Sequence, residues 1–379
     1  MKDYIYLDNA STTPLEREVL DAMTPYLTEY FGNANSVHGI GRKAVSGLDE
    51  ARQTVADIIG ANFNEVYFTS GGTESDNLAI RGAYFARGDR NKIVLSSIEH
   101  PAVLQTAIAV KSLGAVVETV SPNGSGILSI NEYVSKGLHD AFLVSMMLAN
   151  NEIGTIQPVK ELSVVCKESG ALLFTDAVQA IGSMDINVKD LGVDMLSFSA
   201  HKFGGPKGVG VLFIKNGTKF SPQITGGHQE RSKRGGTSNV AGAVGLATAL
   251  KLSRKKIKEK GEYLLNLRNY FIDGVRSSVD GVTLNGDRDI RILGNANLTF
   301  SGVDGEALLY ALDINGVCAS LGSACSSGTI EPSYVLKEIG LSDSEAKSTV
   351  RFSLSYNNTR EEIDRAIKII SNCVKSIKN

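Results

Sequence analysis

The sequence predicts an α/β protein with a mostly parallel central sheet, followed by a smaller α+β domain. Between about residues 65 and 215, short β-rich runs alternate with helical segments, a pattern typical of βαβ units. Continuous apolar runs such as AFLVSMML indicate strands that are buried on both faces of the sheet. The predicted strands lie in EVYFTS, KIVLSS, AVVETV, AFLVSMML, ALLFTDA, DMLSFS and VGVLFI.

The C-terminal part of the chain predicts the second domain. A long helical pattern from Asn239 to about Val279 is expected to connect the two domains. After it, the strand candidates VTLNG, NANLTFS and TVRFSLS mix with the helical segments GEALLYALD, PSYVLKEIG and TREEIDRAIKIISN. We therefore expect a large α/β domain at 16–254 and a small α+β domain formed by 1–15 together with 255–379.

Charge and hydropathy exclude several classes of protein. The chain has 39 Lys and Arg residues against 41 Asp and Glu residues, so bulk attraction to nucleic acid or to an acidic membrane is not expected. The N-terminal stretch MKDYIYLDNASTTP lacks the apolar core of a secretory signal. No apolar run approaches the roughly 20 residues of a membrane span. We expect a cytoplasmic protein that binds neither nucleic acid nor membranes.

The four cysteines are too few and too scattered for a disulfide framework in a chain of 379 residues. Cys318 and Cys325 lack the matching histidines or second cysteine pair of a metal site, so no metal is expected. Cys166, Cys318 and Cys373 fit the role of small apolar residues. Cys325 lies instead in GSACSSG, a stretch of small residues and glycines where a thiol could react.

Polar residues follow the predicted strands at the edge where ligands of such sheets bind. After EVYFTS, two glycines lead into a helix whose free backbone N–H groups suit an anion, with Thr73 and Asp76 at the spacing of a capping box. After KIVLSS, His100 precedes Pro101, a residue that favours the first helical turn. Each motif alone is satisfied by a structural role, as a capped helix or a hydrogen-bonding histidine.

Two further strand ends carry amide and carboxylate groups. Asn150 and Asn151 follow AFLVSMML, and a turn-forming role is expected for Asn150. Asp176 ends the run ALLFTD, and Gln179 follows three residues later. A carboxylate at the end of a buried strand requires a cationic or N–H partner, for which a neighbouring Arg or Lys is the ordinary choice.

The last of these strand ends, DMLSFS, leads to Ser199, His201 and Lys202. Taken together, the strand ends favour a site for pyridoxal phosphate, which needs an amine for a Schiff base and an anion site for its phosphate. It also needs a carboxylate beside its pyridine nitrogen and a flat group over its ring. A dinucleotide-binding protein would show G-x-G-x-x-G after the first strand, and none is present there. The four requirements are met by Lys202, Thr73, Asp176 and His100, in that order.

Ten stretches spread over essentially the whole chain form a specific combination. They are YLDNASTTP at 6–14, TSGGTESDN at 69–77, EHPAV at 99–103, NNEIGTIQP at 150–158, TDAVQAIG at 175–182, SFSAHKFGGPKGVG at 197–210, GGHQERSKRGGT at 226–237, GSACSSG at 322–328, EPSYVL at 331–336 and RFSLS at 351–355. The combination resembles the cysteine desulfurases of the NifS/IscS type, within the class V aminotransferase group of fold-type I pyridoxal phosphate enzymes. The resemblance implies that fold and that cofactor.

The resemblance also implies a role for each residue around the cofactor. Lys202 would form the Schiff base, His100 would stack on the ring, Asp176 would contact the pyridine nitrogen and Gln179 the ring hydroxyl. The implied phosphate ligands are Thr73, Ser199 and His201, with Thr237 from the second subunit of a homodimer.

For the substrate, the resemblance implies L-cysteine. Arg351 would hold its carboxylate with help from Asn151, a use that suits the planar fork of arginine. Cys325 would be the nucleophile, with His100 as the proton acceptor that activates it. Freed from the cofactor, Lys202 would remove the α-proton, alanine would leave, and the sulfur would remain as a persulfide for an acceptor protein. That acceptor would be an iron–sulfur scaffold or a tRNA-thiolation enzyme.

Two alternatives and two departures from the family pattern accompany this interpretation. An aminotransferase or lyase on the same fold, including a selenocysteine lyase, would not require Cys325. A non-catalytic, cofactor-loaded docking protein would not require Lys202. This chain has DNASTTP where the family commonly has DNAATTP, and Leu321 replaces a serine in SLGSACSSG. Neither change removes a chemical group that has been assigned a role.

Overall fold

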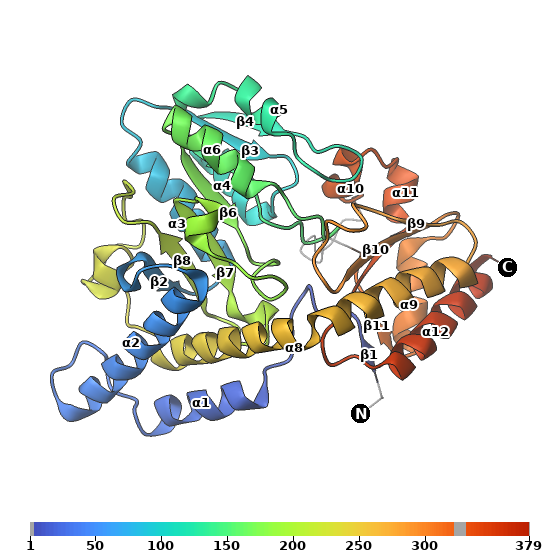
Figure 1. Ribbon diagram of the computed structural model, residues 1–379, viewed down its shortest axis with the longest axis horizontal. Coiled ribbons are helices and arrows are strands. Elements are labelled where there is room, and N and C mark those ends of the chain that lie inside the picture. The colour runs from blue at the N-terminus through green and yellow to red at the C-terminus, as the bar shows by residue number, and fades with distance from the viewer. Residues whose placement is uncertain (1–3, 322–330, 379) are drawn as a thin grey trace.

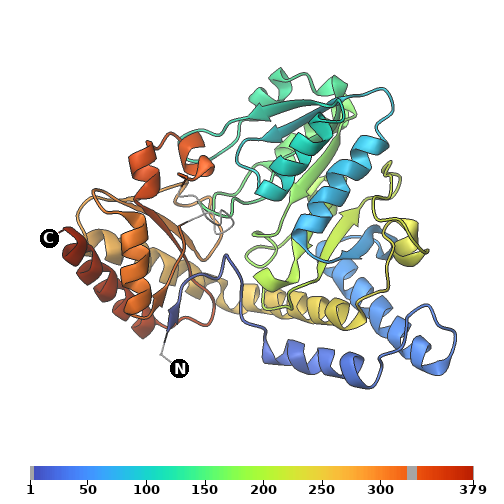
Figure 2. The ribbon, with the colours of Figure 1, turned by 180° about the vertical axis from the view of Figure 1, so that it is seen from behind.

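The structure, a computed structural model, describes residues 4–321 and 331–378 of the chain. Two groups of elements lie side by side, and the long helix α8 (Val240–Ser278) extends from one into the other (Figure 1). The smaller group brings the N-terminal strand together with the C-terminal strands and helices (Figure 2). The predicted α/β fold is confirmed.

The larger group is built on a sheet that has seven strands within the described residues, in the order β2-β8-β7-β6-β5-β3-β4. The strands β7, β6, β5, β3 and β4 run parallel, whereas β8 pairs antiparallel with both β7 and β2. Each predicted run contains one of these strands. Their bounds are β2 Val66–Thr69, β3 Lys92–Ser96, β4 Val116–Val120, β5 Ala141–Ser145, β6 Leu172–Asp176, β7 Met195–Ser199 and β8 Gly210–Ile214.

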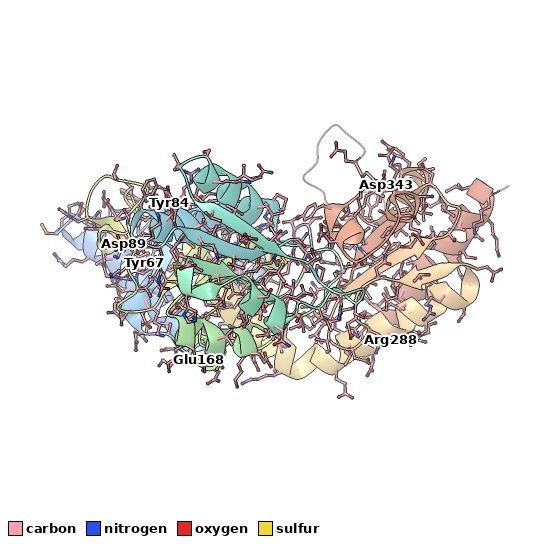
Figure 3. All side chains as sticks on the ribbon, turned by 90° about the horizontal axis from the view of Figure 1, so that it is seen from above. Tyr67, Tyr84, Asp89, Glu168, Arg288 and Asp343 are labelled. Atoms are coloured by element: carbon pink, nitrogen blue, oxygen red, sulfur yellow. The ribbon has the colours of Figure 1, made fainter. Side chains whose placement is uncertain are left out.

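Helices cover both faces of this sheet because alternate residues of the apolar strands point to opposite sides. On β6, Phe174 packs with α3 (Gly72–Phe85) and α4 (Pro101–Lys111), while Leu173 packs with α2 (Gly39–Ile59), α6 (Val159–Ser169) and the first half of α8. Seen from above, Tyr84 of α3 and Glu168 of α6 lie on opposite sides of the sheet (Figure 3).

Helix α8 contributes to two separate hydrophobic cores. Its N-terminal residues Val240, Leu246 and Leu250 are buried with the large sheet. Its C-terminal residues Leu264 and Phe271 are buried in a second cluster with the C-terminal strands. The two clusters support a division into two domains, and the boundary between residues 254 and 255 stays a prediction.

The smaller group contains an antiparallel sheet in the order β12-β10-β9 and a parallel pair, β1 with β11. The parallel pair joins the start of the chain to this group. Sequence patterns did not indicate β1 and β11, because each has only two residues and no periodicity to detect. The bounds are β1 Ile5–Tyr6, β9 Val282–Leu284, β10 Asn295–Phe300, β11 Val317–Cys318, β12 Thr349–Ser353, α9 Gly305–Ile314, α10 Tyr334–Glu338, α11 Asp343–Lys347 and α12 Arg360–Lys378.

Shorter helices complete the chain. Within residues 4–321 and 331–378, no helix combines the length and the apolar character needed to cross a membrane. The remaining helices are α1 Arg17–Thr28, α5 Ile130–Ser135 and α7 Val188–Leu191.

The substitution Phe271→Ala tests the second core. Phe271 is fully buried, and its ring centroid lies 5.1 Å from that of Phe352 in an edge-on arrangement. Truncation leaves a cavity, so the free energy of unfolding should fall by about 3–5 kcal/mol. Urea unfolding followed by circular dichroism measures the change. Tyr310→Ala, at an aromatic side chain that is 72% exposed, should stay within about 0.5 kcal/mol of the wild type. Equal losses in the two variants would contradict the proposed core.

Candidate active site

Lys202 lies at the end of the short turn Ala200–Lys202 that follows β7. Its Nζ donates hydrogen bonds to the carbonyl oxygens of Ala10, at 2.6 Å, and Ser11, at 2.9 Å. The side-chain amide of Gln179 donates to the same Ala10 oxygen at 3.0 Å. The structure therefore brings together two predicted site residues, the lysine and the glutamine, against the N-terminal segment.

Asp176 ends β6 and is 5% exposed. Its Oδ1 accepts a hydrogen bond from the backbone N–H of Val178 at 2.8 Å. Burial raises the pKa of this carboxyl, and its interactions with His100, the Val178 N–H and Lys202 act in the opposite direction. No ion pair to Asp176 is formed within the described residues, so the ordinary Arg or Lys partner is not what satisfies it.

His100 is the N-cap residue of α4, as the following proline predicted. Its Nδ1 accepts a hydrogen bond from the backbone N–H of Ala102 at 3.1 Å, so in the neutral ring the hydrogen is on Nε2. Burial lowers the pKa of His100, with Asp176 opposing the shift and Lys202 adding to it. The imidazole is therefore neutral near pH 7, which suits a ring that stacks on a flat ligand.

The start of α3 offers backbone N–H groups, because its N-cap residue, Gly71, has no side chain to cap them. A Cβ built on Gly71 would lie 3.7 Å from the Ser199 hydroxyl, so this predicted phosphate ligand faces the helix start. The predicted capping box is wrong. Asp76 lies inside the helix and is buried against the Ser197 hydroxyl at 2.5 Å, while Thr73 occupies the first turn. Thr73 and Asp76 have the spacing of a capping box, but the Asp76 carboxyl contacts Ser197 on a distant strand and does not cap the helix.

His201 also borders this region. Its Nδ1 lies 3.1 Å from the Thr12 hydroxyl, and burial together with the charges of Lys202 and Lys207 lowers its pKa to about 4. Its ring is therefore neutral and can donate a hydrogen bond to an anion. Thr237 makes no hydrogen bond to Thr73, Ser199 or His201 within the described part of this chain, so its role stays a prediction.

Arg351, on β12, meets Asn151 from the large sheet. The Arg351 Nη1 donates to the Asn151 carbonyl at 3.0 Å. Its Nη2 donates to Asp8 Oδ1 at 3.1 Å and to the Ser11 hydroxyl at 2.8 Å. The buried Oδ1 of Asn151 has no hydrogen-bond partner within the described residues. Asp8 and Ser11 were not predicted as site residues, although both lie in the quoted stretch YLDNASTTP.

A short loop of the large sheet holds the smaller group in place. Asn150 makes the expected turn, its Oδ1 accepting from the N–H groups of Glu152 and Ile153. The Glu152 carbonyl accepts from the side-chain amides of Asn295 and Asn297, at 2.9 and 3.2 Å. The buried Glu152 carboxyl lies 2.5 Å from the hydroxyl of Ser333, which also caps α10.

Cys325 lies outside the described residues. Of the other cysteines, Cys166 is buried on α6, and burial raises its pKa to about 12. Burial also raises the pKa of Cys318 and of Cys373. These three thiols are therefore protonated at neutral pH and fit the structural role that was expected of them. Within the described residues, no cluster of three or more His, Cys, Asp or Glu side chains is placed to bind a metal.

A lysine amine, a buried carboxylate, a neutral imidazole and an open helix start thus meet at the carboxyl edge of the parallel strands, where this donor set fits pyridoxal phosphate. The fold and the site define the class of fold-type I pyridoxal phosphate enzymes. The chain belongs to the aminotransferase class-V family, whose pattern matches residues 5–366, and within it to the cysteine desulfurases of the IscS/NifS type.

Three relatives place the chain in that family. The cysteine desulfurase IscS of Dictyoglomus turgidum is 44% identical over 379 residues, which is 100% of this chain and 96% of the relative. The solved structure of a NifS-like protein is 34% identical, with a TM-score of 0.93 over 98% of this chain and 100% of that one. SspA in complex with cysteine is also 34% identical, with a TM-score of 0.81 over 93% of this chain and 99% of that one.

Ser333→Ala tests the link between Glu152 and α10. The change removes both the helix cap and the hydrogen bond to a buried carboxyl, so the free energy of unfolding should fall by about 2–4 kcal/mol. Ser342→Ala is the matched control, since Ser342 caps α11 at the surface and should cost only about 1 kcal/mol. Urea unfolding of both variants gives the difference. If the two losses are equal, the Glu152 contact contributes nothing.

Proposed function

We propose that this protein converts L-cysteine to L-alanine with pyridoxal phosphate and holds the sulfur as a persulfide on Cys325. The observation that carries the proposal is that Lys202 and Arg351 bind the same N-terminal segment, at Ala10 and Ser11. Asp176 and His100 lie close enough to Lys202 to interact with it electrostatically, and Arg351 also binds the Asn151 carbonyl. The whole-chain similarity to cysteine desulfurases supports the same activity. The site offers a lysine for the cofactor and an arginine for the carboxylate of an amino acid.

The cofactor contacts are proposed as follows. Lys202 holds the cofactor through its amine, Asp176 pairs with the ring nitrogen, His100 covers the ring and Gln179 reaches the ring hydroxyl. The bound cofactor withdraws electrons from the carbon next to the substrate amine, so that its proton becomes acidic. The proposed phosphate contacts are Thr73, Ser199, His201 and, from the second subunit of a homodimer, Thr237.

Arg351 is proposed to bind the substrate carboxylate. Its Nη2 now contacts Asp8 and the Ser11 hydroxyl, so a substrate carboxylate meets a guanidinium that is already held in place. The unsatisfied Oδ1 of Asn151 marks the amide as a group that awaits a partner, such as the substrate amine. Within the described residues, the Arg351 side chain is held by three hydrogen bonds, which orients the substrate before any proton moves.

Two side chains of this chain move protons in the proposed reaction. Lys202, as a neutral amine, takes the α-proton at Nζ, and the Ala10 and Ser11 carbonyls keep that atom at the site. His100 takes the thiol proton of Cys325 at Nδ1, which must then release the Ala102 N–H. The Cys325 thiolate attacks the substrate sulfur. An S–S bond forms as the carbon–sulfur bond breaks, and the electron pair stays on the β-carbon, which is protonated to a methyl group. Return of a proton from Lys202 to the α-carbon then gives alanine.

The persulfide is proposed to pass to an acceptor protein, either an iron–sulfur scaffold or a tRNA-thiolation enzyme, in the cytoplasm. Association into a homodimer is supported by exposed apolar side chains on α1 and the loop after it: Leu27 is 60%, Phe31 69% and Val37 88% exposed. A second subunit over this region would bury them.

Cys325→Ala tests the proposed nucleophile. The purified variant should keep the yellow chromophore of the bound cofactor, whereas sulfide release from L-cysteine under a reductant should fall on the order of 10³-fold. Alanine and sulfide are assayed together. Cys318→Ala is the control and should release sulfide at the wild-type rate. If Cys325→Ala retains turnover, the protein is an aminotransferase or lyase on this fold.

Arg351→Lys tests carboxylate binding. Lysine keeps the charge but loses the planar fork, so kcat/KM for L-cysteine should fall by roughly 10–100-fold, mainly through a higher KM. Arg276→Lys, at an exposed position on α8, is the control and should leave both constants unchanged. An unchanged KM in Arg351→Lys, with an unchanged unfolding midpoint, would mean that the carboxylate binds elsewhere.

A further inference from the structure

Two more carboxyl groups lie beside Asp176 in the buried layer under the site. Asp76, on α3, is 1% exposed, and Glu99, just after β3, is fully buried. Neither one takes part in the proposed reaction. Within the described residues, neither forms an ion pair with a lysine, arginine or histidine. Three negative charges in one dry layer would cost several kcal/mol each without a cationic partner.

The two acids flank Asp176 on its two neighbouring strands. On one side, Asp76 Oδ1 lies 2.5 Å from the hydroxyl of Ser197, and Ser197 of β7 is the register partner of Asp176. On the other side, Glu99 Oε1 accepts hydrogen bonds from the Met147 N–H at 2.8 Å and the Ser145 hydroxyl at 3.2 Å, at the end of β5. The strand β6, which Asp176 ends, lies between β7 and β5.

The second oxygen of Glu99 indicates its protonation state. Within the described residues, Glu99 Oε2 and the Ser96 hydroxyl are both buried, and neither makes a hydrogen bond of good geometry. The Ser96 hydroxyl is nevertheless close enough to Glu99 to act on its carboxyl as a weak donor. An ionised carboxylate would leave this buried negative oxygen with at most one poorly aligned hydroxyl donor, whereas a protonated carboxyl carries its own O–H, which can donate.

We propose that Asp76 and Glu99 are held as neutral carboxylic acids, so that Asp176 is the only ionised carboxylate of the three. Both are positioning residues, because they act through Asp176. Each neutral acid removes a repulsion that would otherwise make Asp176 easier to protonate. The consequence for the cofactor's ring nitrogen rests on the proposed function, but the protonation of the two acids does not.

The electrostatic surroundings agree with this geometry. Burial, followed by the charge of Asp176, raises the pKa of Glu99 to about 8, although hydrogen bonds from the Met147 N–H and from the Ser145 and Ser96 hydroxyls act in the opposite direction. The same two causes raise the pKa of Asp76 well above its usual range, with Glu99 adding to the shift. Two tyrosines near Glu99 carry no positive charge: Glu99 raises the pKa of Tyr133, and the Tyr334 hydroxyl donates to the Glu99 backbone oxygen.

Infrared spectroscopy of the full-length protein at pH 7 tests the protonation directly. The carbonyl band of a neutral carboxylic acid is well separated from the bands of carboxylates. Glu99→Gln and Asp76→Asn keep the shape of each side chain. The difference spectrum of wild type minus each variant should show a carboxylic acid band and no carboxylate band. The control, Glu361→Gln at an exposed position on α12, should show carboxylate bands alone.

Carboxylate bands in the difference spectrum for Glu99 or for Asp76 would overturn the proposal for that residue. Because the spectrum does not depend on turnover, an inactive enzyme with a carboxylic acid band would overturn the proposed function and leave this inference intact. If an amide variant does not fold, Glu99→Met and Asp76→Ser give the same spectral comparison.

The pH dependence of stability provides a second readout. An acid whose pKa is raised by folding stabilises the folded state most below its unfolded pKa, and this contribution is lost as the pH rises through the folded pKa. Wild type should therefore lose stability relative to Glu99→Gln between pH 5 and pH 8, since the glutamine cannot ionise. Midpoints of urea unfolding measure the difference in stability between wild type and Glu99→Gln at each pH. A difference that stays constant over this range would overturn the proposal for Glu99.

Discussion

The site depends on one strip of chain, Asp8–Thr13, that lies between the two groups of elements and binds to both. Toward the smaller group, Asp8 pairs with Arg351, and the Ala10 N–H donates to the Ser353 hydroxyl. Toward the larger group, the Ala10 and Ser11 carbonyls accept from Lys202, and Thr13 contacts the His201 carbonyl. Lys202 and Arg351, the residues proposed to act on the substrate and to orient it, are therefore both positioned by the same segment of backbone.

The N-terminal strip also helps to explain how the site accommodates the buried charge of Arg351. Arg351 is 2% exposed and is held by Asp8, by a hydroxyl and by a carbonyl, so its charge is paired before any ligand arrives. Within the described residues, Asp176 accepts a hydrogen bond from the Val178 N–H and interacts electrostatically with His100 and Lys202, without a salt bridge. The Asp176 carboxylate is thus less fully paired than Arg351, which suits its proposed role beside the ring nitrogen of pyridoxal phosphate.

Most of the fold could be predicted from the sequence, because the strands of the large sheet are apolar runs and α8 has a clear helical period. The site residues at the strand ends could also be named, since parallel strands deliver them to one edge. Long-range pairing could not be predicted. Asp76 matched a local capping pattern but is bound to Ser197, 121 residues away. Asp8 and Arg351, 343 residues apart, gave no sign of their ion pair, and Arg351 alone looked like an ordinary strand charge.

Helix α8 has a consequence for the chain as a folding unit. Its 39 residues supply one wall of each hydrophobic core, and the N-terminal strip crosses between the same two cores a second time. A chain break within α8 would remove packing residues from one core. The two groups of elements would still be connected by residues 8–13. The two groups of elements are therefore not independent modules. Because they share α8 and the N-terminal strip, gene recombination could replace them only together.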